Sequence, residues 1–380
     1  MKIIYCTHSI CNPGGMERVL YNKVRFLAEK MKWDVSVVTT DQHGKQPFYP
    51  FPDSVKLTDL GINYSEDNVK GAFRKICGYL KKRKKHKKML SELLMREKAD
   101  IVVSLYPSES SFIPDIKDGS KKVLEIHYCK FFRLQYGRKG LLGAIDRWRT
   151  RQDERIVSRF DKFVVLTNED RGYWGNIPNI TVIPNAAMMV AEKYSDVSAK
   201  RVIAVGRLDY QKGFDRLVKA WEIVQKSGKY NDWRLDIFGQ GEWKDMLQNM
   251  INERNLNTSA FINKPVKNIG DEYAASSMLV MSSNYEGFPM VMIEAMACGL
   301  PVVAFRFKCG PEDIISEGEN GMIVDEGDIE GLAYGMMKLM DDDALRKRLS
   351  DNARNIVSTY SEKAVMEKWI DLFNSLTTEQ

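Results

Sequence analysis

Short runs of β-branched and apolar residues alternate along this chain with longer stretches in which apolar residues recur every three or four positions. The run KIIYCTHS at 2–9 and the stretch MERVLYNKVRFLAEKM at 16–31 form the first such pair. Runs of the first kind predict buried strands, and the second spacing predicts amphipathic helices. Because strands that alternate with helices build βαβ units, the pattern predicts an α/β fold with mostly parallel sheets.

The alternation stops once and then begins again. In the first half, further strands are expected at WDVSVVTT, ADIVVSLY, KKVLEIHYC, KFVVLT and ITVIP. In the second half, strands are expected at RVIAVG, RLDIFG, SAFIN, MLVMSS, PVVAF and GMIV. A chain of 380 residues is longer than one hydrophobic core usually serves. We therefore predict two α/β domains, at 1–187 and 188–362, and a final helix within 363–380.

The two halves carry opposite net charge. Residues 1–187 contain 34 Lys and Arg against 21 Asp and Glu, a net charge of +13, whereas the remainder contains 23 against 30, a net charge of −7. A basic body favours partners that carry phosphate, such as nucleic acid, anionic lipid or a charged saccharide carrier.

Much of the positive charge lies in FRKICGYLKKRKKHKKMLSELL at 73–94. From Arg74 to Lys88 this segment holds nine Lys or Arg and no acid. As a helix it would present one face made of Phe73, Ile76, Leu80, Lys84, Lys87, Leu90 and Leu94. Such a face suits the head-group boundary of an anionic membrane, and a solvated basic helix is the alternative. Because no aromatic stacking motif interleaves with the lysines, nucleic acid is the weaker candidate partner.

The composition also bears on the compartment. No window reaches 18 uncharged apolar residues, and MKIIYCTHSI lacks the long apolar core of a signal peptide, so we expect neither a membrane span nor a signal peptide. The six cysteines form no CxxC pair and the four histidines are dispersed, which suggests neither a disulfide framework nor a zinc site. We expect a reducing cytoplasm.

Candidate chemistry lies in the strand-to-helix loops, because open α/β sheets bind ligands at the carboxyl ends of their strands. The segment NYEGFPMVMIEAM at 284–296 follows a predicted strand and begins a helix at Pro289. Glu286 precedes that helix, and Glu294 lies one to two turns inside it. First-turn N–H groups favour an anion, and carboxylates accept hydrogen bonds from paired hydroxyls, so the segment suits a phosphorylated sugar. The alternative interpretation is that Glu286 is an ordinary acid near the helix N-cap and that Glu294 lies on a solvated helix face.

The loop GRLDYQKG at 206–213 adds two cations to this edge of the second sheet. Arg207 and Lys212 follow the strand RVIAVG, and a guanidinium fork with an ammonium group is a common means of holding a diphosphate. The alternative interpretation is that Arg207 and Lys212 are ordinary surface cations without a ligand. Their place opposite an anion-favouring helix supports the functional interpretation.

Glycines and histidines mark the corresponding edge of the first half. Gly14 and Gly15 lie between the first strand and the first helix, where a bare backbone can approach a phosphate or sugar, although a simple turn would explain them as well. His127 and His8 each end a predicted strand. A single histidine at such a place more often has a hydrogen-bonded structural role than a catalytic one, and we favour the structural role most for His8, because the glycine pair already explains that loop. The acidic run at 341–343 fits a helix cap, so no metal site is assigned.

Together these motifs resemble a known family. EGFPMVMIEAMACGLPVVA, with Glu286 and Glu294 in an E-x7-E pattern, GRLDYQKG, FGQGE, NPGGME and VIPN resemble the GT4-type retaining glycosyltransferases of the GT-B fold over almost the whole chain. The E-x7-E pattern with its upstream Arg and Lys is specific, whereas the glycine pair and the histidine are not. The resemblance implies two Rossmann-like domains facing each other across a cleft, the first on the acceptor side and the second binding a nucleotide-sugar. It also implies that the last helix returns to the first domain through the apolar stripe Val365, Trp369, Leu372 and Phe373.

The resemblance gives each candidate residue a role. Arg207 and Lys212 would neutralise the donor diphosphate, and Glu294 would accept the ribose hydroxyls. Glu286 would hold hydroxyls of the transferred sugar, and His127 would lie near the reacting sugar; these two complete the catalytic set with Arg207 and Lys212. The other donor-binding positions are Gly14 and Gly15 near the diphosphate, Asn263 and Lys264 beside the base, and Gly287, Phe288, Pro289 and Met290 along the sugar and phosphate.

The family also implies the type of reaction. A hexose-type sugar would move from a nucleotide diphosphate, UDP rather than GDP, to a saccharide or lipid-linked saccharide in surface polysaccharide or glycolipid synthesis. No metal and no other cofactor is expected, because Arg207 and Lys212 supply the positive charge. Front-face and double-displacement paths both stay open. Since many such enzymes act on lipid-linked acceptors, the resemblance favours docking of 73–94 on the cytoplasmic face of the inner membrane.

Three positions depart from the family's usual residues, and two other functions fit part of the pattern. Asn263 stands where glycine is usual, Ser282 and Ser283 replace Pro-Ser, and Ala186 replaces the glycine of PNG. These departures bear on the base and acceptor contacts and not on the diphosphate site. A sugar-nucleotide 2-epimerase of GT-B architecture would turn over nucleotide-sugar without an acceptor. A non-enzymatic binder of anionic membranes would use only 73–94.

Overall fold

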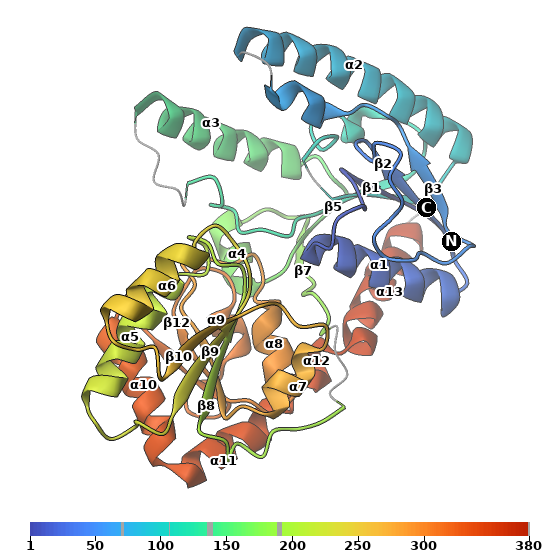
Figure 1. The fold of residues 1–380 in the computed structure, drawn as a ribbon. Helices are drawn as coiled ribbons and strands as arrows, with labels where there is room; N and C mark the ends of the chain where they lie inside the picture. Colours follow the sequence, from blue (N-terminus) through green and yellow to red (C-terminus); the bar gives the residue numbers. More distant parts are fainter. Residues whose placement is uncertain (70–71, 106, 135–139, 188–191, 379–380) are drawn as a thin grey trace. The chain divides into compact units, whose positions relative to one another are not determined.

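The computed structural model describes residues 1–69, 72–105, 107–134, 140–187 and 192–378, and it divides the chain into two compact units. The first unit consists of Met1–Leu166, Asp170–Ile183 and Met366–Gln380, and the second of Thr167–Glu169 and Pro184–Val365. Each unit holds one parallel sheet with helices on its faces (Figure 1). The predicted fold class is confirmed. Residues 188–191, where the second domain was expected to begin, lie outside the described ranges.

The first sheet has seven parallel strands in the order β3-β2-β1-β4-β5-β6-β7. Its strands are β1 Lys2–Thr7, β2 Asp34–Thr39, β3 Lys56–Asp59, β4 Ile101–Ser104, β5 Lys121–Glu125, β6 Lys162–Val165 and β7 Ile180–Val182. Its helices are α1 Gly15–Glu29, η1 Tyr64–Val69, α2 Ala72–Glu97, η2 Ile113–Asp115, α3 Gly140–Val157, α4 Asn168–Trp174 and α13 Glu362–Thr378. Among the strands of this sheet, sequence patterning missed only the edge strand β3, because its four residues KLTD carry two charges and stay largely exposed.

The second sheet has six parallel strands in the order β10-β9-β8-β11-β12-β13. Its strands are β8 Arg201–Val205, β9 Arg234–Phe238, β10 Ala260–Asn263, β11 Met278–Met281, β12 Val302–Phe305 and β13 Gly321–Val324. Its helices are α5 Phe214–Lys226, α6 Lys244–Glu253, α7 Ile269–Ala274, α8 Met290–Ala297, α9 Pro311–Ile314, α10 Ile329–Asp341, α11 Asp343–Ala353 and α12 Ile356–Tyr360. Every predicted strand of this half is present.

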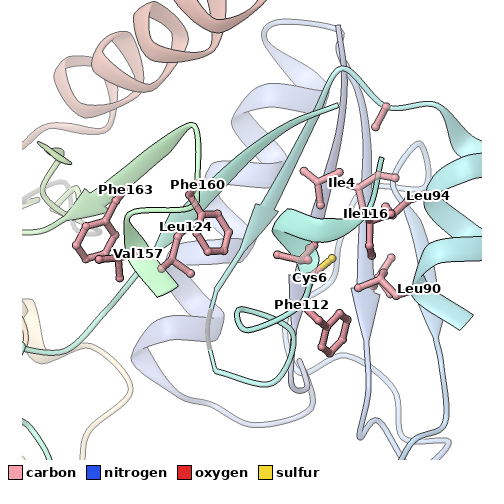
Figure 2. Close-up of a cluster of buried hydrophobic side chains, with 14 of the residues drawn as sticks. Ile4, Cys6, Leu90, Leu94, Phe112, Ile116, Leu124, Val157, Phe160 and Phe163 are labelled. Carbon is pink, nitrogen blue, oxygen red and sulfur yellow. The ribbon is translucent and has the colours of Figure 1, made fainter. Parts of the chain in front are cut away.

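Alternating side chains bury both faces of the first sheet. Ile4, Cys6 and Leu124 contribute to a core that also contains Leu90 and Leu94 of α2 (Figure 2). Tyr5 and Glu125 point to the opposite face, where Lys23 of α1 lies against both of them. Trp369 of α13 covers the Lys23 ammonium at 3.6 Å, and Phe373 packs 6.2 Å from Trp33, both distances to ring centroids. The last helix therefore packs on the first unit from Met366 onward.

Helix α2 divides into a buried and an exposed half. Leu90 and Leu94 are fully buried, whereas Ile76 and Leu80 are 60% and 58% exposed. The prediction that these residues share one docking face is therefore wrong, because the sheet covers the second half of the helix. The side chain of Phe73 lies outside the described residues. Within the described ranges, no helix is both long enough and apolar enough to cross a bilayer.

Candidate functional site

The main candidate site lies at the switch point of the second sheet. β8 and β11 are neighbours in this sheet, but the chain leaves them toward opposite edges, to β9 and to β12. Open α/β sheets bind ligands at such a point, outside the carboxyl ends of the strands. The loop after β8 carries Arg207 and Lys212, and the loop after β11 carries Glu286.

Two glycines allow these loops to meet. Gly213 has a positive φ of 59°, and a Cβ there would lie 2.3 Å from the Ser282 carbonyl oxygen. A Cβ at Gly206 would lie 2.9 Å from Cε of Lys212. Ser282 Oγ also donates a hydrogen bond of 3.1 Å to the Lys212 carbonyl. Because neither glycine has a side chain, the Lys212 ammonium can reach the end of β11.

Glu286 is the centre of a buried polar cluster. Its Oε1 accepts hydrogen bonds from Lys212 Nζ at 2.6 Å and from Ser283 Oγ at 2.8 Å, and its Oε2 accepts one from Gln211 Nε2 at 3.1 Å. Glu286 is 5% exposed, and the Lys212 side chain is 13% exposed. A buried carboxylate needs this degree of pairing, because desolvation of an unpaired charge costs several kcal/mol. Lys212 and Glu286, which the sequence placed separately at this sheet edge, are therefore in direct contact.

Arg207 joins the cluster indirectly. Its guanidinium donates a 2.7 Å hydrogen bond to Gln211 Oε1 and lies 3.3 Å from Asp209, while 69% of the side chain is exposed. Gln211 thus connects Arg207 to Glu286. Of the two predicted cations, Lys212 is mostly covered and held in place, and Arg207 is largely open to solvent.

The turn before α8 is held by packing. The backbone N–H of Glu286 donates to the Lys308 carbonyl, and Phe288 is buried with its ring 5.8 Å from that of Tyr360. Pro289 occupies the position before the helix, which begins at Met290, one residue later than predicted. Its ring fits against Gly310, where a Cβ would lie 2.4 Å from the proline Cδ. Gly287 precedes Phe288 in this turn.

Glu294 lies inside α8 with 8% exposure. Burial raises the pKa of Tyr273 in α7 well above its usual value, and the negative charge of Glu294 raises it further. The same two causes raise the pKa of Cys298 to about 11. Glu294 is therefore a buried carboxylate beside α7 and not the solvated residue of the alternative interpretation.

Asn263 and Lys264 follow the edge strand β10. The side-chain amide of Asn263 donates a 2.9 Å hydrogen bond to the Asp236 carboxylate. The backbone carbonyl of Asn263 accepts a hydrogen bond from the Gly239 N–H at 3.0 Å. Asn263 therefore ties the ends of β9 and β10 together, which explains a polar residue at this position. Lys264 is exposed.

The glycine pair of the first unit begins α1. Gly14 is the N-cap, and a Cβ there would lie 2.0 Å from a carboxylate oxygen of Glu17. A Cβ at Gly15 would have no heavy atom within 4 Å. A side chain at Gly14 would only require the flexible Glu17 carboxylate to move, and Gly15 leaves an open backbone at the helix start.

His127 lies two residues after β5, beside the buried ion pair of Glu125 and Lys23. Its Nε2 is 3.1 Å from Glu125 Oε1, which also accepts a 2.5 Å hydrogen bond from Lys23 Nζ. Burial alone would raise the pKa of Glu125, but Lys23 and His127 outweigh it and lower that pKa to about 2. The ionised carboxylate fixes the orientation of the imidazole.

Sequence reasoning missed four partners of these residues, namely Gln211, Ser283, Lys23 and Glu125. Gln211 and Ser283 lie within the motifs themselves, so their place beside Lys212 and Glu286 was a usable signal. Lys23 and Glu125 are 102 positions apart and meet only across the sheet. No pattern along the chain connects them.

Comparison with known proteins agrees with this architecture. The model of glycosyl transferases group 1 matches residues 191–356, and that of glycosyltransferase family 4 matches residues 13–187. An uncharacterized glycosyltransferase of Haemophilus influenzae is 29% identical over 372 residues, which cover 97% of this chain and 98% of the relative. The amylovoran biosynthesis glycosyltransferase AmsD of Erwinia amylovora is 37% identical over 224 residues, 56% of this chain and 62% of AmsD.

A solved structure shares the fold. A point mutant of TarM from S. aureus, in complex with fondaparinux, alpha-GlcNAc-glycerol and UDP, superposes with a TM-score of 0.77 at 19% identity, over 98% of this chain and 100% of that one. The two family models together match residues 13–187 and 191–356, which are most of both units, and the paired charges lie at the switch point of the second sheet. The chain belongs to the GT4-type glycosyltransferases with the GT-B fold.

Proposed function

We propose that this glycosyltransferase moves a hexose-type sugar from a UDP-sugar to a saccharide or lipid-linked saccharide, with retention of configuration and without a metal ion. The observation that carries the proposal is the Lys212 and Glu286 cluster at the switch point of the second sheet. The similarity to a glycosyltransferase of amylovoran biosynthesis supports a place in polysaccharide or glycopolymer synthesis.

The two cations have different parts in the proposed donor complex. Lys212 is held by Glu286, so its ammonium is already in position before a ligand arrives. Arg207 is largely exposed, and its guanidinium can turn from Asp209 to a phosphate. Together they would neutralise the charge that develops on the leaving diphosphate, which elsewhere is the task of a metal ion.

The carboxylates would hold hydroxyl groups. Oε1 of Glu286 already accepts from Lys212 and Ser283, whereas Oε2 accepts only from Gln211, so Oε2 can still accept a hydrogen bond from the transferred sugar. Glu294 would accept the ribose hydroxyls from inside α8. In the first unit, Glu125 engages Nε2 of His127, which leaves Nδ1 for the reacting sugar.

The test is proton NMR of the full-length chain with UDP-glucose, UDP-galactose and UDP-N-acetylglucosamine. We expect one of these donors to be hydrolysed to UDP and the free sugar, and the α-anomer of that sugar should appear first. The rate should be the same with and without EDTA. Initial release of the β-anomer would contradict retention, and strict dependence on Mg²⁺ or Mn²⁺ would contradict metal independence. Accumulation of the 2-epimer of the nucleotide-sugar would identify the epimerase instead.

A second proposal concerns the cytoplasmic membrane face. The first half of α2 exposes Ile76, Tyr79 and Leu80 by 60%, 47% and 58% beside its basic residues. Apolar side chains that reach the acyl boundary, with cations that gain roughly 1 kcal/mol each near anionic lipid, would hold the enzyme reversibly at the inner membrane.

Vesicle co-sedimentation tests this docking. Binding should rise with phosphatidylglycerol content, weaken with salt, and fall in a variant with exposed cations of α2 changed to glutamate: Arg74, Lys81, Lys84 and Lys88. Lys82 is unsuitable, because it bonds to the Asn63 carbonyl and Glu66. A matched control reverses four exposed cations of the second unit: Lys244, Lys267, Lys338 and Arg348. Equal binding of neutral and anionic vesicles, or equal loss in both variants, contradicts the proposal.

A further inference from the structure

Lys23 is a lysine of α1 whose side chain is buried. It is 5% exposed, and among the described residues its ammonium group has one hydrogen-bond acceptor, the Oε1 of Glu125 at 2.5 Å. Lysine is almost never fully buried unless it is paired. Burial lowers the pKa of Lys23, and the charge of Glu125 opposes that shift. The other N–H groups of the ammonium therefore need a second source of stabilisation.

Aromatic rings supply that stabilisation. The ammonium nitrogen of Lys23 lies 3.6 Å from the ring centroid of Trp369 in α13 and 5.9 Å from that of Tyr5 in β1. A cation within about 6 Å of a ring face is attracted to it, most strongly by tryptophan and where water is excluded. Trp369 is 1% exposed, so packing fixes its ring. The last helix, which runs beside α1 (Figure 1), therefore sets the position of the Lys23 ammonium.

This position matters because Lys23 and His127 share one carboxylate oxygen. Nε2 of His127 donates a hydrogen bond to the same Oε1 of Glu125 at 3.1 Å. The second oxygen of Glu125, Oε2, is buried and has no hydrogen-bond partner among the described residues. The carboxylate is thus held through one oxygen, and the terminal torsion of a glutamate is soft. If the ammonium moved, the carboxylate could turn, and the imidazole would lose its direction.

We propose that Trp369 is a positioning residue for sugar transfer: its ring holds the Lys23 ammonium against Glu125, and this pair keeps the proton of His127 on Nε2. Nδ1 of His127 is then free to accept a hydrogen bond from the reacting sugar. This assignment rests on the proposed role of His127 in transfer. It gives the last helix a part in orienting the imidazole, in addition to covering the sheet.

Long-range proton–nitrogen NMR of the full-length chain, labelled at histidine, measures the tautomer of His127 without any substrate. Only four histidines contribute signals, and His127→Asn identifies those of His127. The wild type should show a single tautomer with the proton on Nε2. Trp369→Met removes the ring face and should replace that tautomer by a mixture.

Trp33→Met is the matched control. It makes the same substitution at a tryptophan that also packs on α13, with its ring 6.2 Å from that of Phe373, and within the described ranges Trp33 has no contact with the Lys23 ammonium. This variant should keep the tautomer of the wild type.

Steady-state kinetics with the UDP-sugar that the wild type accepts give the second readout. In Trp369→Met, kcat should fall about tenfold or more while the donor KM stays within about twofold, because the imidazole is misdirected and the donor site is unchanged. A thermal melt shows that each variant is folded. If Trp369→Met does not fold, a trifluorinated tryptophan at position 369 keeps the shape of the side chain and weakens the negative face of its ring. It should shift the tautomer and kcat in the same direction.

Three outcomes overturn the proposed role of Trp369. The first is the same His127 tautomer in the wild type and in a folded variant with the altered ring. The second is a changed tautomer with wild-type kcat, and the third is an equal fall of kcat in Trp369→Met and Trp33→Met. If the wild type turns over no UDP-sugar, the proposed function fails, and the tautomer still decides whether Trp369 acts on His127.

Discussion

At the scale of single residues, Lys212 has two tasks that can be separated. It compensates the buried charge of Glu286, and it is proposed to bind the donor diphosphate. Lys212→Met should lower the free energy of unfolding by about 3 kcal/mol, because it leaves a buried carboxylate without its cation. Arg207→Met should lower it by less than about 0.5 kcal/mol, because that side chain is exposed. Urea denaturation measures both.

The double variant Lys212→Met/Glu286→Gln is the control for this prediction. Removing both charges should restore most of the stability, because a neutral pair needs no charge compensation. Binding of UDP should remain weaker than in the wild type, because the double variant still lacks the Lys212 ammonium. Equal destabilisation by Lys212→Met and Arg207→Met would contradict the assigned difference between the two cations.

Glu125 should act as a positioning residue for His127. Glu125→Gln alone leaves the buried Lys23 ammonium uncompensated and should destabilise the chain by about 3 kcal/mol. Lys23→Met/Glu125→Gln removes both charges and should recover that stability. Its kcat for donor turnover should nevertheless stay about tenfold or more below wild type with an unchanged donor KM, because the imidazole has lost its fixed orientation. Wild-type kcat in the double variant would reduce Glu125 to a structural role.

At this scale the sequence identified residues but not their partners. The spacing of Glu286, Arg207 and Lys212 placed them at one sheet edge, because all follow parallel strands. It did not predict that Gln211 lies between Arg207 and Glu286, or that Glu125 accepts from Lys23. Those contacts depend on side-chain directions and on packing across the sheet, which a linear pattern does not contain.

At the scale of elements, α2 contains a histidine that no pattern distinguished. His86 lies within the run KKRKKHKK, yet it is 1% exposed, and burial lowers its pKa to about 4. Glu109, before η2, is equally buried, and burial raises its pKa to about 7 although Ser104 donates a hydrogen bond to it. Both groups are therefore neutral in the folded state near pH 6.

These two groups should give opposite pH dependence to stability. The lowered pKa of His86 gives stability that is present above pH 6.5 and lost as the pH falls toward 4. The raised pKa of Glu109 gives stability that is present below pH 4.5 and lost as the pH rises toward 7. Each effect amounts to about 3 kcal/mol, so the two largely offset each other in the wild type.

Single variants should separate the two effects. Compared with the wild type, Glu109→Gln should lose stability more steeply as the pH falls from 6.5 to 4, since only His86 then responds. His86→Gln should instead lose stability as the pH rises from 4.5 to 7. The measurement is urea denaturation at a series of pH values. Profiles for both variants that run parallel to the wild type would contradict the assignment.

Element boundaries and burial were predictable to different degrees. Every strand but β3, together with helices such as α1 and α13, followed from apolar periodicity, because parallel sheets bury both faces. The sequence did not predict the divided burial of α2, because the apolar residues of this helix share one face along its whole length. Only the position of the sheet beneath Leu90 and Leu94 makes the second half a core element (Figure 2).

At the scale of the whole molecule, two sheets of the same design carry different chemistry. The switch point of the second sheet holds the Lys212 and Glu286 cluster, and that of the first holds a cavity lined by aromatic and hydroxyl groups. Both positions follow from the strand orders 3-2-1-4 and 10-9-8-11. The sequence predicted the two domains and the charged edge, but a cavity arises from five separate segments and leaves no local signal.

Isothermal titration calorimetry of UDP into the full-length chain is the most direct test of the central claim that Lys212 and Arg207 hold a nucleoside diphosphate. UDP should bind in EDTA-treated buffer, and Lys212→Met should weaken binding by about 100-fold, since it removes a charged partner of the phosphate. Lys219→Met, which removes a lysine paired with Asp215 on α5, should bind as the wild type does. Absence of UDP binding, or equal affinity in the Lys212→Met and Lys219→Met variants, would contradict the account.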